Sequence, residues 1–222
     1  MVIIGVAAAP VIFLLFWFYH KDKFDKEPLS MLFLAFLGGC LSILPAILME
    51  GLWHYFGYTQ EGGNLYLAFY AFIVVGFSEE ISKYFFVRRI IKKSYVDEPY
   101  DGILYSVTVS LGFAFIENIF YVYQNGTGVG IMRAFTAVPA HATFAAVMGY
   151  YLAKAKFNGH YTFNTLLAIA GAVILHGSYD YFLFLKNIPL IQMGAIVSLI
   201  IGIWITRKAI KIHNESSSFK GQ

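Results

Sequence analysis

Seven apolar segments, each long enough to cross a membrane, restrict the folds open to this chain. An α-helix needs about 20 mostly apolar residues to span roughly 30 Å of hydrocarbon. Of the 222 residues, 59% are apolar and only 13% are charged, whereas soluble domains carry about 25% charged residues. We therefore predict an all-α fold, a polytopic membrane helical bundle of about seven transmembrane helices. The predicted spans are residues 2–19, 30–49, 65–87, 102–123, 133–152, 163–184 and 188–206.

The basic residues predict the orientation of these helices, because they gather in alternate loops. Those loops contain Lys21, Lys23, Lys26, Arg88, Arg89, Lys92, Lys93, Lys154 and Lys156. Basic loops of membrane proteins face the cytoplasm. The N-terminus is therefore predicted to lie outside and the C-terminus in the cytoplasm. Two basic residues break the alternation: Arg133, after the fourth span, and Lys186, after the sixth.

The domain organisation is predicted to be simple. One membrane-embedded domain covers residues 1–210, and residues 211–222 form a short polar cytoplasmic tail that we expect to be disordered. The first span has no basic segment before it, so we interpret it as a retained helix and not as a cleaved signal. A single cysteine, Cys40, excludes an intrachain disulfide and a multi-cysteine metal site. The net charge of +3 follows from the loop pattern and does not indicate a nucleic-acid partner.

Two adjacent glutamates, Glu79 and Glu80, interrupt the third apolar segment. One charged side chain deep in a bilayer costs about 2.5–3.5 kcal/mol, so other groups must stabilise both. Lys83 follows them by four and three residues, which places it within reach of either carboxylate on one helix face. A purely structural ion pair is the simpler interpretation. Three charges within five residues more strongly indicate a working carboxylate whose charge Lys83 tunes.

Five further polar groups interrupt the later spans. Glu117 and its neighbour Asn118 lie in the fourth span, and His141 follows a proline in the fifth. His176 and Asp180 share one helix face in the sixth span, where the carboxylate can orient the imidazole. Each group could instead form a structural hydrogen bond between helices. Ionisable groups inside spans nevertheless indicate a functional site by default.

Depth in the membrane tests whether these groups can meet. At about 1.5 Å of rise per residue, Glu117, His141, His176 and Asp180 lie about 6–12 Å from the outer face. Glu79 lies deeper, at about 21 Å, and fits less well. These depths favour a polar site in the outer half of the bilayer.

A further acidic segment, Asp97 to Gly102, precedes the fourth span. An acidic residue near a helix start is a common cap. We therefore expect its acids to be solvated or to cap the helix, and we assign them no catalytic role.

Four polar motifs, taken in order, resemble those of the PrsW family of bacterial intramembrane proteases. They are EEISK at 79–83, YDGILYSVTVSLGFAFIEN at 100–118, VPAHATFAAVMGYY at 138–151 and HGSYDYF at 176–182. The stretch FYHKDKFDKEP at 18–28 fits as well, so the resemblance covers nearly the whole chain. This family is distantly similar to the CAAX prenyl-protease and bacteriocin-immunity (Abi) membrane proteins, and to the APH-1 subunit of gamma-secretase.

The resemblance implies site-1 cleavage of a membrane-anchored anti-sigma factor in the bacterial plasma membrane, leading to release of a stress-response sigma factor. The expected catalytic residues are Glu79, Glu80, Glu117, His141 and His176, supported by Lys83, Asn118 and Asp180. We expect Glu79 to act as the general base on a water molecule. His176 would then stabilise the oxyanion or protonate the leaving amine.

The cofactor and the function class each have an alternative. Metal-free hydrolysis is favoured, but Glu79, Glu117, His141 and His176 offer enough nitrogen and oxygen ligands for a catalytic Zn²⁺. A proton- or ion-coupled transporter would also use buried Glu and His side chains, although no inverted repeat is visible. A non-catalytic membrane scaffold is a third possibility, but a scaffold has no obvious need for all of these ionisable groups.

Overall fold

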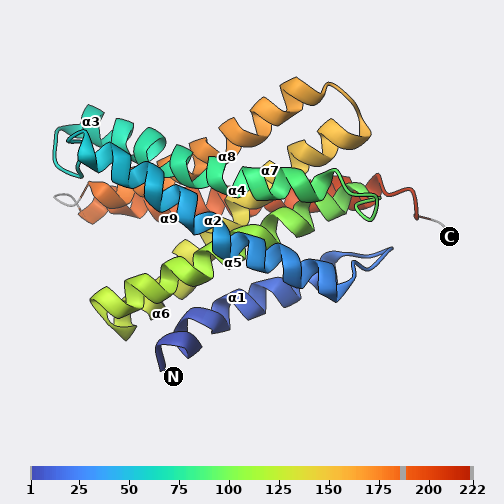
Figure 1. Cartoon of the computed structure of the whole chain (residues 1–222), viewed down its shortest axis with the longest axis horizontal. Helices are drawn as coiled ribbons and strands as arrows, with labels where there is room; N and C mark the ends of the chain where they lie inside the picture. Colours follow the sequence, from blue (N-terminus) through green and yellow to red (C-terminus); the bar gives the residue numbers. More distant parts are fainter. Residues whose placement is uncertain (1, 186–188, 221–222) are drawn as a thin grey trace.

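The computed structural model describes residues 2–185 and 189–220, and these ranges contain helices and connecting loops but no strand (Figure 1). Seven helical segments are long and apolar enough to cross a membrane, which confirms the predicted number. Lys186 and the predicted start of the seventh span at residue 188 lie outside the described residues. The spanning segments are Val2–Lys21, Leu29–Tyr55, Asn64–Ile91, Pro99–Asn125, Thr127–Phe157, Tyr161–Phe184 and Gln192–Glu215.

Two of the seven spans are composite. The third joins α3, a π-helix labelled η1 and α4, and the fifth joins α6 and α7 through a break at Thr136. The helices are α1 (Val2–Lys21), α2 (Leu29–Tyr55), α3 (Asn64–Phe69), η1 (Tyr70–Phe77), α4 (Ser78–Ile91), α5 (Pro99–Asn125), α6 (Thr127–Phe135), α7 (Ala137–Phe157), α8 (Tyr161–Phe184) and α9 (Pro189–Glu215).

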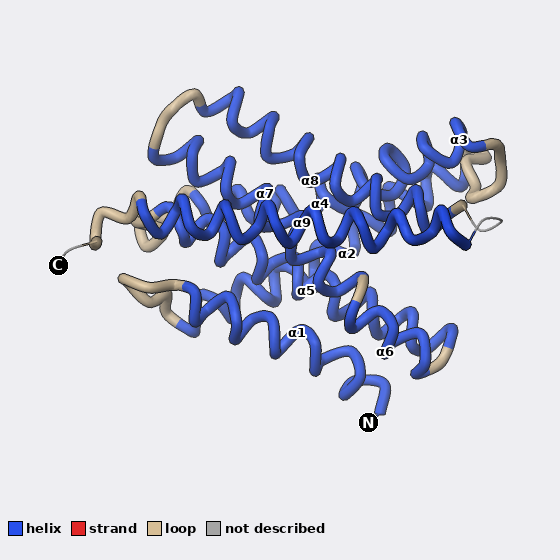
Figure 2. The backbone as a smooth tube through the Cα atoms, turned by 180° about the vertical axis from the view of Figure 1, so that it is seen from behind, coloured by secondary structure: helices blue, strands red, loops and turns tan. Residues whose placement is uncertain are grey.

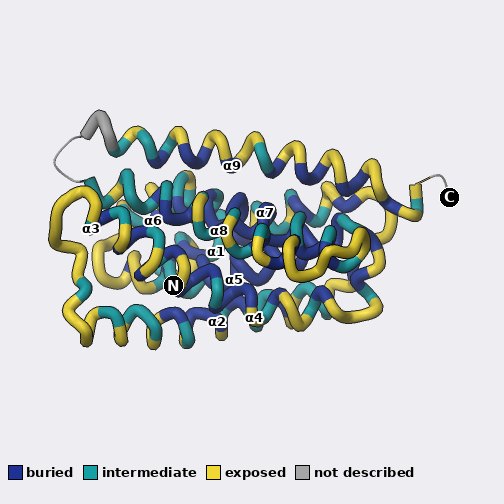
Figure 3. The backbone as a smooth tube through the Cα atoms, turned by 90° about the horizontal axis from the view of Figure 1, so that it is seen from above, coloured by how far each residue is buried: buried dark blue, intermediate teal, exposed yellow. Residues whose placement is uncertain are grey.

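Helix α5 forms the centre of the bundle. Of its apolar stretch, 72% is buried, against 17% of that of α1. Figure 3 shows α9 along one side of the bundle and α2 along the opposite side, with α5 between them. The outer helices expose large apolar side chains such as Phe13 and Leu48. Such a surface suits lipid, since hydrocarbon does not penalise exposed apolar groups.

The close approach of α2 to α5 depends on two glycines. A Cβ added at Gly39 would lie 1.9 Å from the carbonyl oxygen of Val109, and one added at Gly112 would lie 2.2 Å from that of Phe36. Small residues at helix contacts let backbones approach closely in membrane bundles. Packing at this contact therefore brings the backbone of α2 against the central helix.

The loops lie at the two ends of the bundle (Figures 1 and 2). The C-terminus and the loops α1–α2, α4–α5 and α7–α8 share one end, whereas the N-terminus and the α2–α3 loop lie at the other. The loops rich in Lys and Arg are therefore at one end, as the alternation requires. That this end faces the cytoplasm remains a prediction.

The predicted disorder of the C-terminal tail is wrong for residues 211–215, which are helical. Helix α9 continues to Glu215, and His213 and Asn214 are buried. The Nδ1 atom of His213 donates a hydrogen bond to the Pro99 carbonyl at 2.8 Å. Polar composition misled the prediction, because these residues pack against the polar end of the bundle instead of extending into solvent.

We predict that Gly39→Ala destabilises the protein whereas Gly51→Ala does not. Both glycines lie in α2, but a Cβ at Gly51 meets no atom within 4 Å. Overpacking typically costs about 1–3 kcal/mol, whereas Ala in place of an exposed helical Gly gains up to about 1 kcal/mol. Thermal unfolding of the two variants in the same detergent measures the difference. Equal melting temperatures would contradict the close packing of α2 on α5.

Candidate active site

A π-helix precedes the two glutamates of α4. Helix η1 ends at Phe77, directly before Ser78 and Glu79. Short π-helical stretches are rare and frequently occur at functional sites. Because a π-helix is wider than an α-helix, it rises less per residue, so Glu79 lies nearer to the outer end than an α-helical count places it. The depth mismatch expected for Glu79 is therefore reduced, and the contacts below show that it reaches the other polar groups.

Close contact between η1 and α8 brings His176 to these glutamates. A Cβ added at Gly177 would lie 2.4 Å from the Phe72 ring and 2.8 Å from the Phe72 Cα atom. Only glycine fits at this position without a shift of one helix. The neighbouring His176 ring stacks on Phe144, with the ring centroids 4.9 Å apart. The Phe144 ring thus supports one face of the imidazole.

Lys83 joins the two glutamates, as the sequence spacing predicts. Its Nζ atom lies 3.0 Å from Glu79 Oε2 and 2.8 Å from Glu80 Oε1. The lysine is 1% exposed and Glu80 is 0% exposed. The ammonium also lies 4.1 Å from the centre of the Phe113 ring. A buried positive charge thus compensates two adjacent negative charges within the membrane.

Lys83 also determines the tautomer of His141. An ammonium group can only donate, so the His141 Nδ1 atom, 3.2 Å from Nζ, must be the acceptor. The His141 Nε2 atom lies 2.9 Å from Glu117 Oε2, and there it donates. The partners of His141 therefore match a neutral imidazole that carries its proton on Nε2. Both ring nitrogens are engaged, which favours a positioning role for this side chain.

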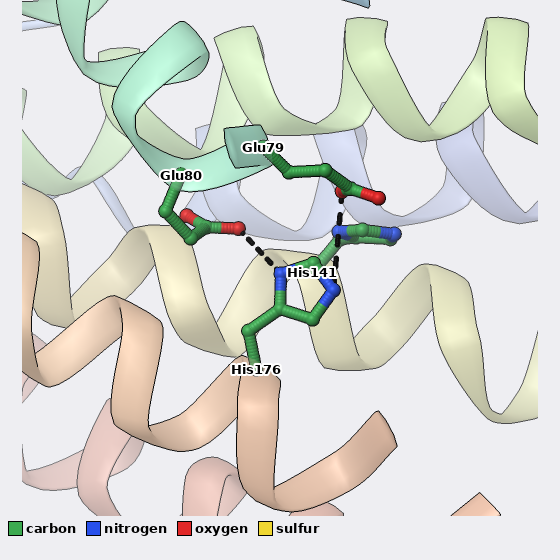
Figure 4. Close-up of side chains that lie close together, drawn as sticks. All are labelled: Glu79, Glu80, His141 and His176. Carbon is green, nitrogen blue, oxygen red and sulfur yellow. Dashed lines mark hydrogen bonds and ion pairs between the residues drawn. The ribbon is translucent and has the colours of Figure 1, made fainter. Parts of the chain in front are cut away.

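His176 lies between carboxylates (Figure 4). Its Nδ1 atom is 2.9 Å from Glu80 Oε1, and its Nε2 atom is 3.3 Å from Asp180 Oδ2. Glu79 Oε2 lies 3.9 Å from the same Nε2 atom. The predicted contact between His176 and Asp180 is confirmed. Glu80 and Asp180 together orient the ring, so that Nε2 faces Glu79.

Glu117 has a second partner that the sequence did not predict. Arg133, at the end of α6, places Nη2 2.6 Å from Glu117 Oε2 and Nε 3.1 Å from Asn118 Oδ1. The break at Thr136 ends α6 and allows Arg133 to lie beside α5. Sequence interpretation counted Arg133 as a loop residue. Its exception to the alternation of basic loops was the signal that could have identified it.

A cavity of about 360 Å³ opens onto these groups. The acidic and basic residues that line it are Glu50, Glu79, Glu117, Arg133, His141, His176 and Asp180. Glu80 and Lys83 are not among the lining residues and lie behind Glu79 and His176. The structure thus separates groups that a bound substrate can touch from groups that act through them.

Glu50 is the second residue that the sequence interpretation missed. It follows the predicted end of the second span at residue 49, but α2 continues to Tyr55 and places Glu50 in the cavity wall. A span boundary in error by a few residues concealed it. With Glu79, Glu117 and Asp180 already in the wall, Glu50 is the fourth carboxyl group of the cavity.

Comparison with known proteins identifies the family. Residues 27–206 match the model of the "PrsW family intramembrane metalloprotease". The chain belongs to the PrsW family. It is 38% identical over 190 residues to "Protease PrsW" of Geobacillus kaustophilus, covering 83% of this chain and 81% of the relative. The protein of the same name from Bacillus subtilis is 36% identical over 184 residues, covering 82% of each chain. No solved structure matches this chain.

Membership of the PrsW family confirms several predictions. The protein is a protease and a multi-pass protein of a bacterial membrane. This result favours hydrolysis over the transporter and scaffold alternatives. The catalytic roles of individual PrsW residues stay predictions, because similarity to named proteases does not test them.

The PrsW family description raises the question of a metal. Glu79, Glu80, His141 and His176 each offer a ligand atom, and these atoms lie within 4.8 Å of one another. The group differs from the predicted ligand set in having Glu80 in place of Glu117. Nitrogen and oxygen donors of this type suit Zn²⁺, so the cluster could bind a metal. Lys83, however, contacts three of the four side chains, so its ammonium competes with a cation for the same acceptors.

Replacement of Lys83 by methionine should strongly destabilise the protein. Removal of one partner from a buried ion pair typically costs about 3–5 kcal/mol, because it leaves an uncompensated charge. Lys211→Met is the matched control, since it breaks an i,i+4 pair with Glu215 whose lysine side chain is 76% exposed. Exposed pairs contribute less than about 1 kcal/mol. Thermal unfolding in detergent compares the two variants, and equal losses would contradict the role of Lys83 as the central counter-charge.

Proposed function

We propose that this protein performs site-1 cleavage of a single-span membrane protein of the anti-sigma-factor type, using a water molecule activated by Glu79. The convergence of Glu79, Glu117 and His176 on one cavity carries the proposal. Ionisable side chains are expensive inside a membrane. A hydrolytic site requires such groups to face a cavity that can hold both the substrate and a water molecule.

The position of the cavity supports cleavage near the outer surface. Its wall includes Gln60 in the α2–α3 loop, Gln124 near the end of α5 and Phe184 at the end of α8. All three belong to the end of the bundle that the basic-loop pattern predicts to be extracytoplasmic. A peptide bond just outside a substrate's membrane span could therefore enter from this side.

In the proposed reaction, Glu79 accepts a proton from water as the water oxygen attacks the scissile carbonyl carbon. The carbonyl oxygen becomes an oxyanion, which a protonated His176 stabilises when its Nε2–H turns from Asp180 to the oxyanion. The C–N bond then breaks, and the amine leaves with a proton from His176 or Glu79. The products are a new carboxyl and a new amino terminus, and no redox partner is needed.

The remaining polar residues are proposed to position these two groups. Glu80 and Asp180 orient His176 through opposite sides of its ring. Lys83 neutralises part of the charge around Glu79, and it holds His141 in the tautomer that donates to Glu117. Ordering of this kind lowers the cost of reaching the reactive geometry, because catalytic groups need little rearrangement in the transition state.

A metal-dependent version is the second candidate, supported by the family description and by the cluster of four ligand atoms. Glu79, Glu80, His141 and His176 would hold Zn²⁺, which would supply Lewis-acid activation of water. We favour the metal-free version, because the Lys83 ammonium already contacts three of these ligands. In the metal-free version, the Lys83 ammonium supplies the positive charge that Zn²⁺ would supply in the other.

Glu79→Gln should reduce cleavage about 10²–10⁴-fold, the usual contribution of a general base. His176→Ala should lose about 10²–10³-fold, as expected for an oxyanion donor. The assay uses the purified protein in liposomes with a single-span anti-sigma factor, and fragments are quantified by gel and mass spectrometry. Glu61→Gln, an exposed acid in the α2–α3 loop, is the control and should cleave at the wild-type rate. Wild-type activity in Glu79→Gln would exclude Glu79 as the base.

Chelation should leave the cleavage rate unchanged. We expect 1,10-phenanthroline to have no effect on wild type, and elemental analysis to find no stoichiometric zinc in the active protein. Loss of activity on chelation, with recovery on adding Zn²⁺, would establish the metal-dependent version. Failure to cleave any of several anti-sigma factors, while another membrane peptide is cut, would overturn the proposed substrate class and leave the protease activity intact.

A further inference from the structure

A second cluster of carboxylates lies at the opposite end of the bundle from the cavity. It contains Asp22, directly after α1, and Glu98 and Asp101 at the start of α5. Figure 1 shows that the α1–α2 and α4–α5 loops and the C-terminus share this end. The three side chains are almost completely buried, with exposures of 1%, 0% and 0%. The expectation that the acids of this segment cap the helix is confirmed for Glu98 and Asp101, which form a capping box at the start of α5.

These carboxylates are close together. Each of the three offers an oxygen, and these oxygens lie within 4.8 Å of one another. Like charges at such separations repel strongly in a buried setting. A fold that brings them together must therefore supply a compensating positive charge or protons.

The described residues supply no direct ion pair to this cluster, although Lys26 acts electrostatically on Asp22 and Lys156 on Asp101. None of the ion pairs found within residues 2–185 and 189–220 involves Asp22, Glu98 or Asp101. Two lysines lie nearby, but the ammonium groups of both donate hydrogen bonds to backbone carbonyls. Lys26 donates to the carbonyls of Tyr19 and Asp22, and Lys156 donates to those of Ile91, Lys93 and Val96.

Each carboxyl group also has an oxygen without a partner. The Asp22 Oδ1, Glu98 Oε1 and Asp101 Oδ1 atoms are buried, and within the described part of the chain none of them forms a hydrogen bond. Their second oxygens are engaged. Asp101 Oδ2 accepts from the backbone N–H groups of Asp97 and Glu98 at 2.8 and 2.9 Å, and Glu98 Oε2 accepts from the Ser217 hydroxyl. Buried polar atoms are normally satisfied, and these three oxygens, which no described protein group satisfies, are free to bind a ligand.

We propose that Asp22, Glu98 and Asp101 form a binding site for a hard divalent cation, Mg²⁺ or Ca²⁺. Both ions are bound in proteins by carboxylate and carbonyl oxygens. The oxygen-only ligand set distinguishes this site from the Glu and His cluster around the cavity, whose nitrogen donors suit Zn²⁺. The bound cation would join the end of α1 to the start of α5 and, through Ser217, to the chain after α9. The site is structural, since it lies far from the cavity lining.

The test follows thermal unfolding of the full-length protein in a neutral detergent after treatment with EDTA and removal of the chelator. Titration with Mg²⁺ or Ca²⁺ should raise the wild-type melting temperature to a plateau, because a ligand that binds only the folded state stabilises it. Asp22→Asn and Glu98→Gln should lose this rise. Asp25→Asn, an exposed acid in the same loop, should keep it, and so should Glu79→Gln, which alters only the cavity cluster.

Tyrosine-sensitised Tb³⁺ luminescence gives a direct binding readout. The sensitiser is Tyr100, a fully buried tyrosine that lies in the sequence between Glu98 and Asp101. We expect luminescence that Ca²⁺ displaces in wild type, in Asp25→Asn and in Glu79→Gln, but not in Asp22→Asn. A wild-type protein that responds to neither Mg²⁺ nor Ca²⁺ would overturn the proposal and indicate carboxyl groups that share protons. A response that persists in both Asp22→Asn and Glu98→Gln would equally overturn it.

Discussion

The arrangement of the cavity depends on one ammonium group, that of Lys83, buried inside the helical bundle. Lys83 holds two carboxylates of its own helix, contacts His141 on α7 and lies over the Phe113 ring of α5. An isolated charge at this depth would be strongly unfavourable. Because the charge is shared among partners from three helices, it becomes a constraint on how these helices meet. The polar site and the packing of the central helices are thus stabilised by the same contacts.

Close backbone contacts explain how short side chains can meet across the bundle. Gly177 lets α8 lie against η1, and a Cβ at Gly149 would lie 2.2 Å from the carbonyl oxygen of Gly102 in α5. Because the hydrophobic effect does not drive helices together inside lipid, membrane helices associate through close packing and polar contacts. Here the glycines bring the backbones together, and the polar groups determine which faces meet.

Much of this architecture could be predicted from sequence because its signals are local. Long apolar stretches predict the number of spans, and i,i+3 and i,i+4 spacing predicts that Lys83 meets its glutamates and that His176 meets Asp180. Contacts between elements that depend on a helix break or a helix end were not predictable in this way. Arg133 reaches Glu117 because the fifth span breaks at Thr136, and Glu50 enters the cavity because α2 extends past its apolar stretch. Neither event leaves a periodic pattern in the sequence.

The anchoring of the last helix has a consequence for how the protein is made. The cavity is built from residues between Ile43 and Phe184, all of which leave the ribosome before α9. The opposite end is completed later, when His213 reaches Pro99 and Asn214 reaches the Lys21 carbonyl. The hydrogen bond that ties the end of α1 to α9 therefore forms only after translation has passed residue 214. During synthesis, the hydrolytic groups can therefore assemble before the hydrogen bonds of His213 and Asn214 have formed at the opposite end of the bundle.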